Sequence, residues 1–202
     1  MSRPQTAPPP ATDADRPGSG QVPGEPGIWL VVIADLVVFA VLFGMFLNYR
    51  AEQPALWAAS QAKLTAGFGF ANTVILLTSS LAVVAAVNAT RLGRTVDAGR
   101  AFAAAMGCGL VFVALKAVEW TLKARDGVVP DTNDFFAQYY VFTGLHLLHV
   151  LVGLTALLFA RRIARAGAHG PHDQGLVQSA AIFWHLVDLL WLLLFPIVYF
   201  VH

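Results

Sequence analysis

Apolar residues gather along the chain in five long runs that are separated by short polar segments. The runs cover about 28–49, 65–90, 101–122, 135–159 and 177–201. Each is close to the roughly 20 residues that an α-helix needs to cross a bilayer. Because a bilayer core offers the backbone no water, such runs must satisfy their amide groups internally, as helices do. The pattern predicts an all-α integral membrane protein, a bundle of five transmembrane helices.

The polar segments outside these runs differ in composition. Residues 1–27 are rich in proline, glycine and serine and contain no apolar run, which predicts a disordered, Pro-rich cytoplasmic tail ahead of a five-helix domain, 28–202. The segment 50–63 is predicted to be an amphipathic loop that holds Trp57 at the membrane interface. In the loop 123–135, Asn133 or Asp134 can cap the helix that follows.

Composition and charge narrow the class of protein. Hydrophobic residues make up 57% of the chain and charged residues 12%, and the mean hydropathy is +0.63. This is too apolar for an ordinary soluble domain. A net charge of +1 gives no basic surface for nucleic acid, so we expect no nucleic-acid partner. The lone Cys108 excludes an intrachain disulfide and a Cys-x-x-Cys-His haem attachment.

The distribution of lysine and arginine between the spans predicts the orientation. The tail and the loops that follow the second and fourth spans carry eight of them, whereas the other two loops carry four. Cytoplasmic loops of membrane proteins are enriched in these residues. We therefore expect a multi-pass protein of a bacterial-type inner membrane, with a cytoplasmic N-terminus and a C-terminus on the outer side.

A few ionisable residues lie at bilayer depth, where an unpaired charge is unfavourable and a functional role is common. Six of them form three pairs, each three residues apart and hence on neighbouring positions of one helix face. Asp35 lies about two turns into the first span. The pairs are Lys116 and Glu119, His146 and His149, and His185 and Asp188.

These residues leave three interpretations open. Lys116 and Glu119 are expected to form an internal ion pair, and the others a buried polar network in which Asp35 keeps a functional protonation state. His146 and His149 face the same neighbouring helix in this reading. Alternatively, the two histidines and a carboxylate could bind a metal ion, or one of them could hold a haem together with His185. The chain would then be an independent redox protein.

Five motifs, spread in order over all five spans, carry a resemblance to a known family. The run 29–39 places Asp35 after an aromatic apolar stretch, and 116–120 places Glu119 before Trp120. The other three are Asn-Thr-Val-Ile-Leu-Leu-Thr-Ser-Ser at 72–80, Thr-Gly-Leu-His-Leu-Leu-His-Val at 143–150 and Trp-His-Leu-Val-Asp-Leu-Leu-Trp at 184–191. Together they resemble subunit III of the haem–copper oxidases, and within it the short five-span branch associated with nitric oxide reductases.

The resemblance implies a non-catalytic accessory subunit of a cytochrome c oxidase or nitric oxide reductase. Such a subunit carries no redox centre, so haem and copper would belong to a catalytic, haem-bearing membrane partner, and membrane lipids would be further partners. Asp35 matches the family's carbodiimide-reactive carboxyl and is expected to help sustain proton uptake. The histidine count agrees, because a catalytic subunit needs several histidines for two haems and a copper, and these spans contain three.

Overall fold

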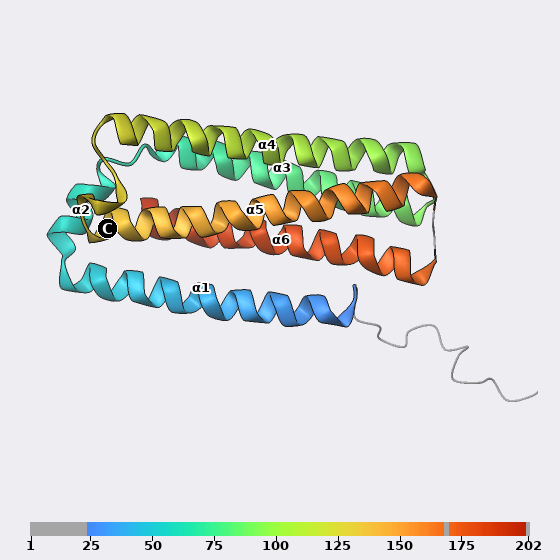
Figure 1. Cartoon of the computed structure of the whole chain (residues 1–202), viewed down its shortest axis with the longest axis horizontal. Helices are drawn as coiled ribbons and strands as arrows, with labels where there is room; N and C mark the ends of the chain where they lie inside the picture. Colours follow the sequence, from blue (N-terminus) through green and yellow to red (C-terminus); the bar gives the residue numbers. More distant parts are fainter. Residues whose placement is uncertain (1–23, 168–169, 201–202) are drawn as a thin grey trace, which may run out of the picture.

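The computed structural model describes residues 24–167 and 170–200, and every regular element in them is helical. Five helices are long and apolar enough to cross a membrane, which confirms the predicted all-α bundle (Figure 1). They are α1 (Pro26–Glu52), α3 (Ala66–Arg91), α4 (Thr95–Arg125), α5 (Asp134–Ala166) and α6 (Pro171–Tyr199). Two short elements, α2 (Pro54–Gln61) and the 3₁₀ turn η2 (Pro130–Thr132), lie between them.

Local sequence explains where the helices begin and end. Pro26, Pro54 and Pro171 stand in the first turns of α1, α2 and α6, where a missing amide proton is tolerated. The predicted cap of α5 is confirmed, because the Asn133 side chain accepts a hydrogen bond from the Phe136 amide at 3.0 Å. Gly167 ends α5 in the left-handed conformation, φ +69°, which glycine adopts without strain. Residues 1–23 of the predicted tail, 1–27, lie outside the described residues, whereas Pro26 and Gly27 already belong to α1.

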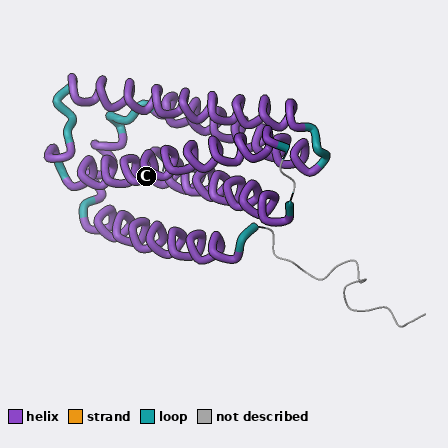
Figure 2. The backbone as a smooth tube through the Cα atoms, turned by 45° about the vertical axis from the view of Figure 1, so that its right-hand side comes forward, coloured by secondary structure: helices purple, strands orange, loops and turns teal. Residues whose placement is uncertain are grey.

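Four of the long helices form an antiparallel bundle, and α1 lies against one side of it. The bundle is built from α3, α4, α5 and α6, and α1 packs along α6 and α5 (Figures 1 and 2). In the most apolar part of each helix, 56% of the α6 residues are buried but only 17% of the α1 residues. Helix α6 is therefore the centre of the fold, and α1 keeps most of its apolar surface for the bilayer.

Two tryptophans of α6 connect this helix to its neighbours through hydrogen bonds and close packing. The indole of Trp184 donates to Ser79 Oγ at 3.0 Å, and that of Trp191 donates to Thr73 Oγ1 at 3.0 Å, both on α3. Trp184 also fills the space beside two glycines of other helices. A Cβ added at Gly153 would lie 2.7 Å from the indole, and one added at Gly109 would lie 2.8 Å from it. Small residues thus permit the close helix contacts typical of membrane bundles.

The segment predicted as an amphipathic interfacial loop is different in the structure. It contains helix α2, and Trp57 is 1% exposed because its ring packs against Phe46 and Phe135. The prediction that Trp57 anchors the membrane interface is therefore wrong. Helix α2 folds back over the end of the bundle, and this buries its tryptophan.

Candidate functional site

Lys116 and Glu119 form the centre of a buried ion-pair cluster together with Tyr139 and Tyr199. The Lys116 ammonium donates to Glu119 Oε2 at 2.9 Å, and the two side chains are 0% and 2% exposed. The other carboxylate oxygen accepts the Tyr139 hydroxyl at 2.8 Å and the Tyr199 hydroxyl at 2.7 Å. The ion pair expected from the sequence is present, and α5 and α6 complete it with two hydroxyl donors.

The surroundings of this cluster stabilise both charges. The Lys116 ammonium lies 4.9 Å from the centre of the Trp191 ring, a distance at which the ring face attracts a cation. Glu119 accepts three hydrogen bonds in total, so its charge is well compensated. Removal of either partner would leave an uncompensated buried charge, so the cluster links α4 energetically to α5 and α6.

Asp35 of α1 and His149 of α5 form a second pair, which we call the Asp35–His149 pair. His149 Nε2 lies 3.3 Å from each carboxyl oxygen, and the side chains are 20% and 15% exposed. The other ring nitrogen, Nδ1, lies 2.8 Å from the Leu145 carbonyl oxygen, which can only accept. Nδ1 must therefore carry a hydrogen, and a neutral imidazole presents a bare Nε2 to Asp35.

A hydrogen bond across the Asp35–His149 pair consequently requires one further proton. That proton lies either on the carboxyl of Asp35, facing a neutral imidazole, or on Nε2 of an imidazolium, facing a carboxylate. Both arrangements use the same heavy-atom positions. The pair can thus exchange the position of one proton without any rearrangement of the helices, a property that the fully engaged Glu119 lacks.

His185 and Asp188 lie on the α3 side of α6. His185 Nδ1 and Ser80 Oγ are 2.7 Å apart, so the imidazole pairs with a neighbouring helix as the sequence suggested. Asp188 is 4% exposed. Neither of its carboxyl oxygens has a hydrogen-bond partner among the described residues.

His146 points into the four-helix core instead of toward the helix that receives His149. It is fully buried between the rings of Phe112, at 5.5 Å, and Trp191, at 5.2 Å. Neither ring nitrogen has a hydrogen-bond partner in the described part of the chain. Residues three apart diverge by about 60° around a helix, and α5 sits between two neighbours. Both imidazoles contact α6, His146 through Trp191 and His149 through Phe183, as the prediction of one shared neighbouring helix requires. Their other contacts differ, because His146 also meets Phe112 of α4 and His149 also meets Asp35 of α1.

The three histidines do not converge. His146 lies among aromatic rings, His149 meets α1 and His185 meets α3. Within residues 24–167 and 170–200 no three His, Cys, Asp or Glu side chains are grouped as metal ligands would be. The positions of the rings do not favour a shared metal ion or a haem held between two of these histidines.

Sequence reasoning missed Tyr139 and Tyr199 as members of the ion-pair cluster, and Ser80 as the partner of His185. The signal was present but weak. Each is a hydroxyl residue within an apolar run, and buried hydroxyls in membrane helices often bond across a helix contact. Which contact each one makes depends on how the helices are paired, which local spacing does not reveal.

Comparison with known proteins agrees with this geometry. Residues 24–202 match the family described as Cytochrome c oxidase subunit III. The chain is 30% identical over 174 residues to the cytochrome c oxidase subunit 3 of Synechocystis sp., with 86% of this chain and 73% of that protein covered. It is 28% identical to the probable cytochrome c oxidase subunit 3 of Nocardia farcinica, with coverages of 86% and 85%. The chain belongs to the cytochrome c oxidase subunit III family and is an accessory subunit of a haem–copper oxidase.

Proposed function

We propose that this accessory subunit supports proton uptake by a catalytic, haem-bearing partner through the Asp35–His149 pair. The observation that carries the proposal is the geometry of the pair, in which Nδ1 of His149 faces the Leu145 carbonyl oxygen and Nε2 faces Asp35, so that a hydrogen bond between the two side chains needs one further proton. A carboxyl and an imidazole that hold one proton between them can accept and release it at a fixed position.

The exposure of the two carboxyl groups supports this choice of residue. Asp35 is 20% exposed and lies on the peripheral helix α1, so a neighbouring subunit can contact it from outside the bundle. Glu119 is 2% exposed, and its oxygens are occupied by three donors. A group that passes protons to a partner must be within reach of that partner, and of the two carboxyls only Asp35 lies on the outside of the bundle.

The proposed orientation puts this pair in the cytoplasmic half of the membrane. The arginine-rich ends of α3, α4 and α5 lie at the same end of the bundle as the start of α1 (Figure 1). By the positive-inside tendency we assign that end to the cytoplasm of a bacterial-type inner membrane. Asp35 then lies about 14 Å along α1 from Pro26, at 1.5 Å per residue.

The partner follows from the names of the relatives. They are described as subunits of cytochrome c oxidase, so we propose an oxygen-reducing oxidase in preference to a nitric oxide reductase. Haem and copper would belong to the catalytic subunit. Dissociating a purified complex should then leave the Soret absorption with the catalytic subunit, and an isolated chain with stoichiometric haem would contradict this assignment.

Asp35→Asn in the assembled complex tests the role in proton uptake. The amide keeps the shape of the carboxyl but cannot titrate, so we expect normal assembly and initial rate with a faster loss of activity during continuous turnover. Asp97→Asn is the matched control, since Asp97 is an exposed carboxylate at the same end of the bundle and pairs only with Arg94 among the ion pairs described. Sustained turnover at wild-type level in Asp35→Asn would reduce the pair to a structural role.

A further inference from the structure

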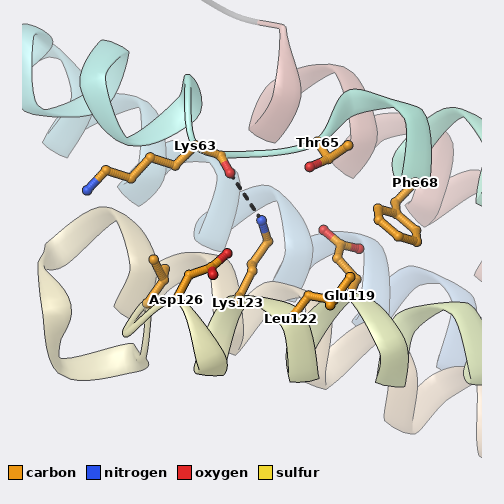
Figure 3. Close-up of a pocket in the computed structure, with 8 residues that line it drawn as sticks. Lys63, Thr65, Phe68, Glu119, Leu122, Lys123 and Asp126 are labelled. Atoms are coloured by element: carbon orange, nitrogen blue, oxygen red, sulfur yellow. Dashed lines mark hydrogen bonds between the residues drawn. The ribbon is translucent and has the colours of Figure 1, made fainter.

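Two hollows border the ionisable pairs of the bundle. One, of about 530 Å³, opens where α3 begins and α4 ends, and Figure 3 shows Glu119 and Lys123 extending from α4 toward it. Glu119 is held beside this space by three hydrogen bonds. The other, of about 420 Å³, lies between α1, α5 and α6, and its border includes Phe183, which packs against His149. The Asp35–His149 pair has fewer hydrogen bonds, so its geometry depends more on packing.

The imidazole of His149 lies where three helices meet. Its ring is nearly parallel to that of Phe183 of α6, with 21° between the planes and 6.3 Å between the centres. The Phe39 ring of α1 stands at 74° to the imidazole, with 5.7 Å between the centres. Both distances lie in the range of attractive aromatic pairs. Two buried phenyl rings from different helices therefore pack on one imidazole of α5.

The orientation of this imidazole decides whether the pair can share a proton. The torsion angle that rotates the ring has broad, roughly two-fold minima, so local sterics do not fix the ring plane. A half-turn would place ring carbons where Nδ1 now faces the Leu145 carbonyl oxygen and Nε2 faces Asp35. The Nε2 contact with Asp35 is 3.3 Å, longer than the usual distance of about 2.9–3.0 Å. This contact therefore gives only weak control over the ring plane.

Phe183 supplies that control. Because its ring is nearly parallel to the imidazole, rotation of the imidazole out of its plane drives a ring edge into the closely packed phenyl face. Phe183 is itself packed against α5, since a Cβ added at Gly153 would lie 3.7 Å from its Cδ1 atom. Gly153 is one turn from His149, so its missing side chain leaves room for the phenyl ring beside the imidazole.

Phe39 fixes the other partner of the pair. It follows Asp35 by four residues, so both lie on the same side of α1. With Leu186 and Leu190 of α6 it forms a small buried cluster. In the most apolar part of α1 only 17% of the residues are buried. Helix α1 therefore depends on this cluster to hold Asp35 level with His149.

We propose that Phe39 and Phe183 are positioning residues of the Asp35–His149 pair. Phe183 fixes the plane of the imidazole, and Phe39 fixes the carboxyl opposite Nε2. Neither phenyl ring gains or loses a proton, and both act through the two polar side chains. The proposal rests on the proposed role of the pair in proton uptake. It makes the shared proton depend on aromatic packing from α1 and α6 as well as on the hydrogen bond from Nδ1 to Leu145.

NMR of the imidazole nitrogens, in the purified full-length chain labelled with heavy nitrogen only at histidine, tests the positioning directly. The chemical shifts report which nitrogen carries a hydrogen, and the signals missing from His149→Leu identify those of His149. In the wild type, Nδ1 should carry the hydrogen. Phe183→Leu keeps an apolar side chain but removes the flat ring, so it should raise the fraction of the other tautomer about fivefold, from the usual strength of an aromatic pair. Phe39→Leu should shift the Nε2 signal toward that of Asp35→Asn.

Phe102→Leu is the matched control, because Phe102 is a fully buried phenylalanine of α4 and has no ring contact with His149 among the described residues. Phe183→Tyr keeps the ring and should restore the wild-type signals. Phe39→Leu keeps the test valid if Phe183→Leu impairs folding. Unchanged His149 signals in both leucine variants would overturn the proposal, as would equal changes in Phe102→Leu.

Turnover of the assembled complex separates the positioning from the proposed function. Phe183→Leu should lose activity during continuous turnover faster than Phe102→Leu, as Asp35→Asn should. Altered His149 signals together with wild-type turnover in Asp35→Asn would uphold the positioning and overturn the role in proton uptake. Unaltered signals together with a faster loss of activity in Asp35→Asn would overturn the positioning and uphold the role.

Discussion

The four-helix core and the contact between α1 and α5 each hold a pair of ionisable residues, but the two pairs differ in burial and in the number of their partners. In the core, Glu119 accepts hydrogen bonds from Lys116 and from two tyrosine hydroxyls, at 2.7–2.9 Å. A tryptophan ring lies beside the Lys116 ammonium. On the α1 face, Asp35 and His149 are partly exposed and 3.3 Å apart.

The difference shows how a membrane protein can hold a fixed charge pair and an exchangeable proton in one bundle. In the four-helix core, neighbouring helices supply enough donors to hold a carboxylate in one position, because one hydroxyl comes from α5 and the other from α6. A peripheral helix supplies one partner and leaves part of the pair accessible. The following substitutions test that contrast, from the largest expected effect to the smallest.

Lys116→Met should produce the largest loss. It leaves the Glu119 carboxylate buried without its cation, and removing one partner of a buried pair destabilises proteins by about 3 to 5 kcal/mol. We expect a marked fall in the melting temperature in detergent, measured by intrinsic fluorescence. The double variant Lys116→Met, Glu119→Gln should recover part of the loss. A single variant as stable as the wild type would mean that the core does not depend on the charge pair.

Gly153→Ala should also destabilise the core, by about 1 to 3 kcal/mol, the usual range for overpacking. The new Cβ would lie 2.7 Å from the Trp184 ring, which is held by its bond to Ser79. Gly107→Ala is the control, because nothing lies within 4 Å of a Cβ at that position. Equal melting temperatures for the two alanine variants would show that Trp184 moves aside easily.

His149→Leu should have a smaller effect. Loss of the imidazole leaves the Asp35 carboxyl without this partner, but the carboxyl can take up a proton and become neutral, so we expect about 1 kcal/mol of destabilisation. Thermal melting in detergent measures the change in the same way as for Lys116→Met. A loss as large as that of Lys116→Met would remove the distinction between the two regions.

His146→Leu should have the smallest effect, although His146 is the more buried of the two histidines. Both ring nitrogens lack partners among the described residues, and replacing an unpaired polar group with an apolar one of similar size is close to neutral or stabilising. A melting temperature equal to or above that of the wild type is expected. A large decrease would reveal a polar contact of His146 that the core geometry does not indicate.

Features that depend on neighbouring residues were determined by the sequence itself. Run length and apolarity predicted five spanning helices, and the turn before α5 indicated Asn133 or Asp134 as its cap, of which Asn133 makes the bond. The Lys116–Glu119 pair was predictable because residues three apart on a helix are neighbours wherever that helix packs. The ordered motifs indicated the subunit III family.

The tertiary structure decided everything that depends on how the helices pair. Asp35 and His149 are 114 residues apart, so nothing in their local spacing indicates that they meet. His146 and His149 both contact α6, but His146 also meets α4 and His149 also meets α1, because residues three apart diverge by about 60° around the helix. Tyr139 and Tyr199 reach Glu119 only because α4, α5 and α6 are aligned in register. Helical periodicity is local, whereas the choice of partners follows from the packing of whole helices.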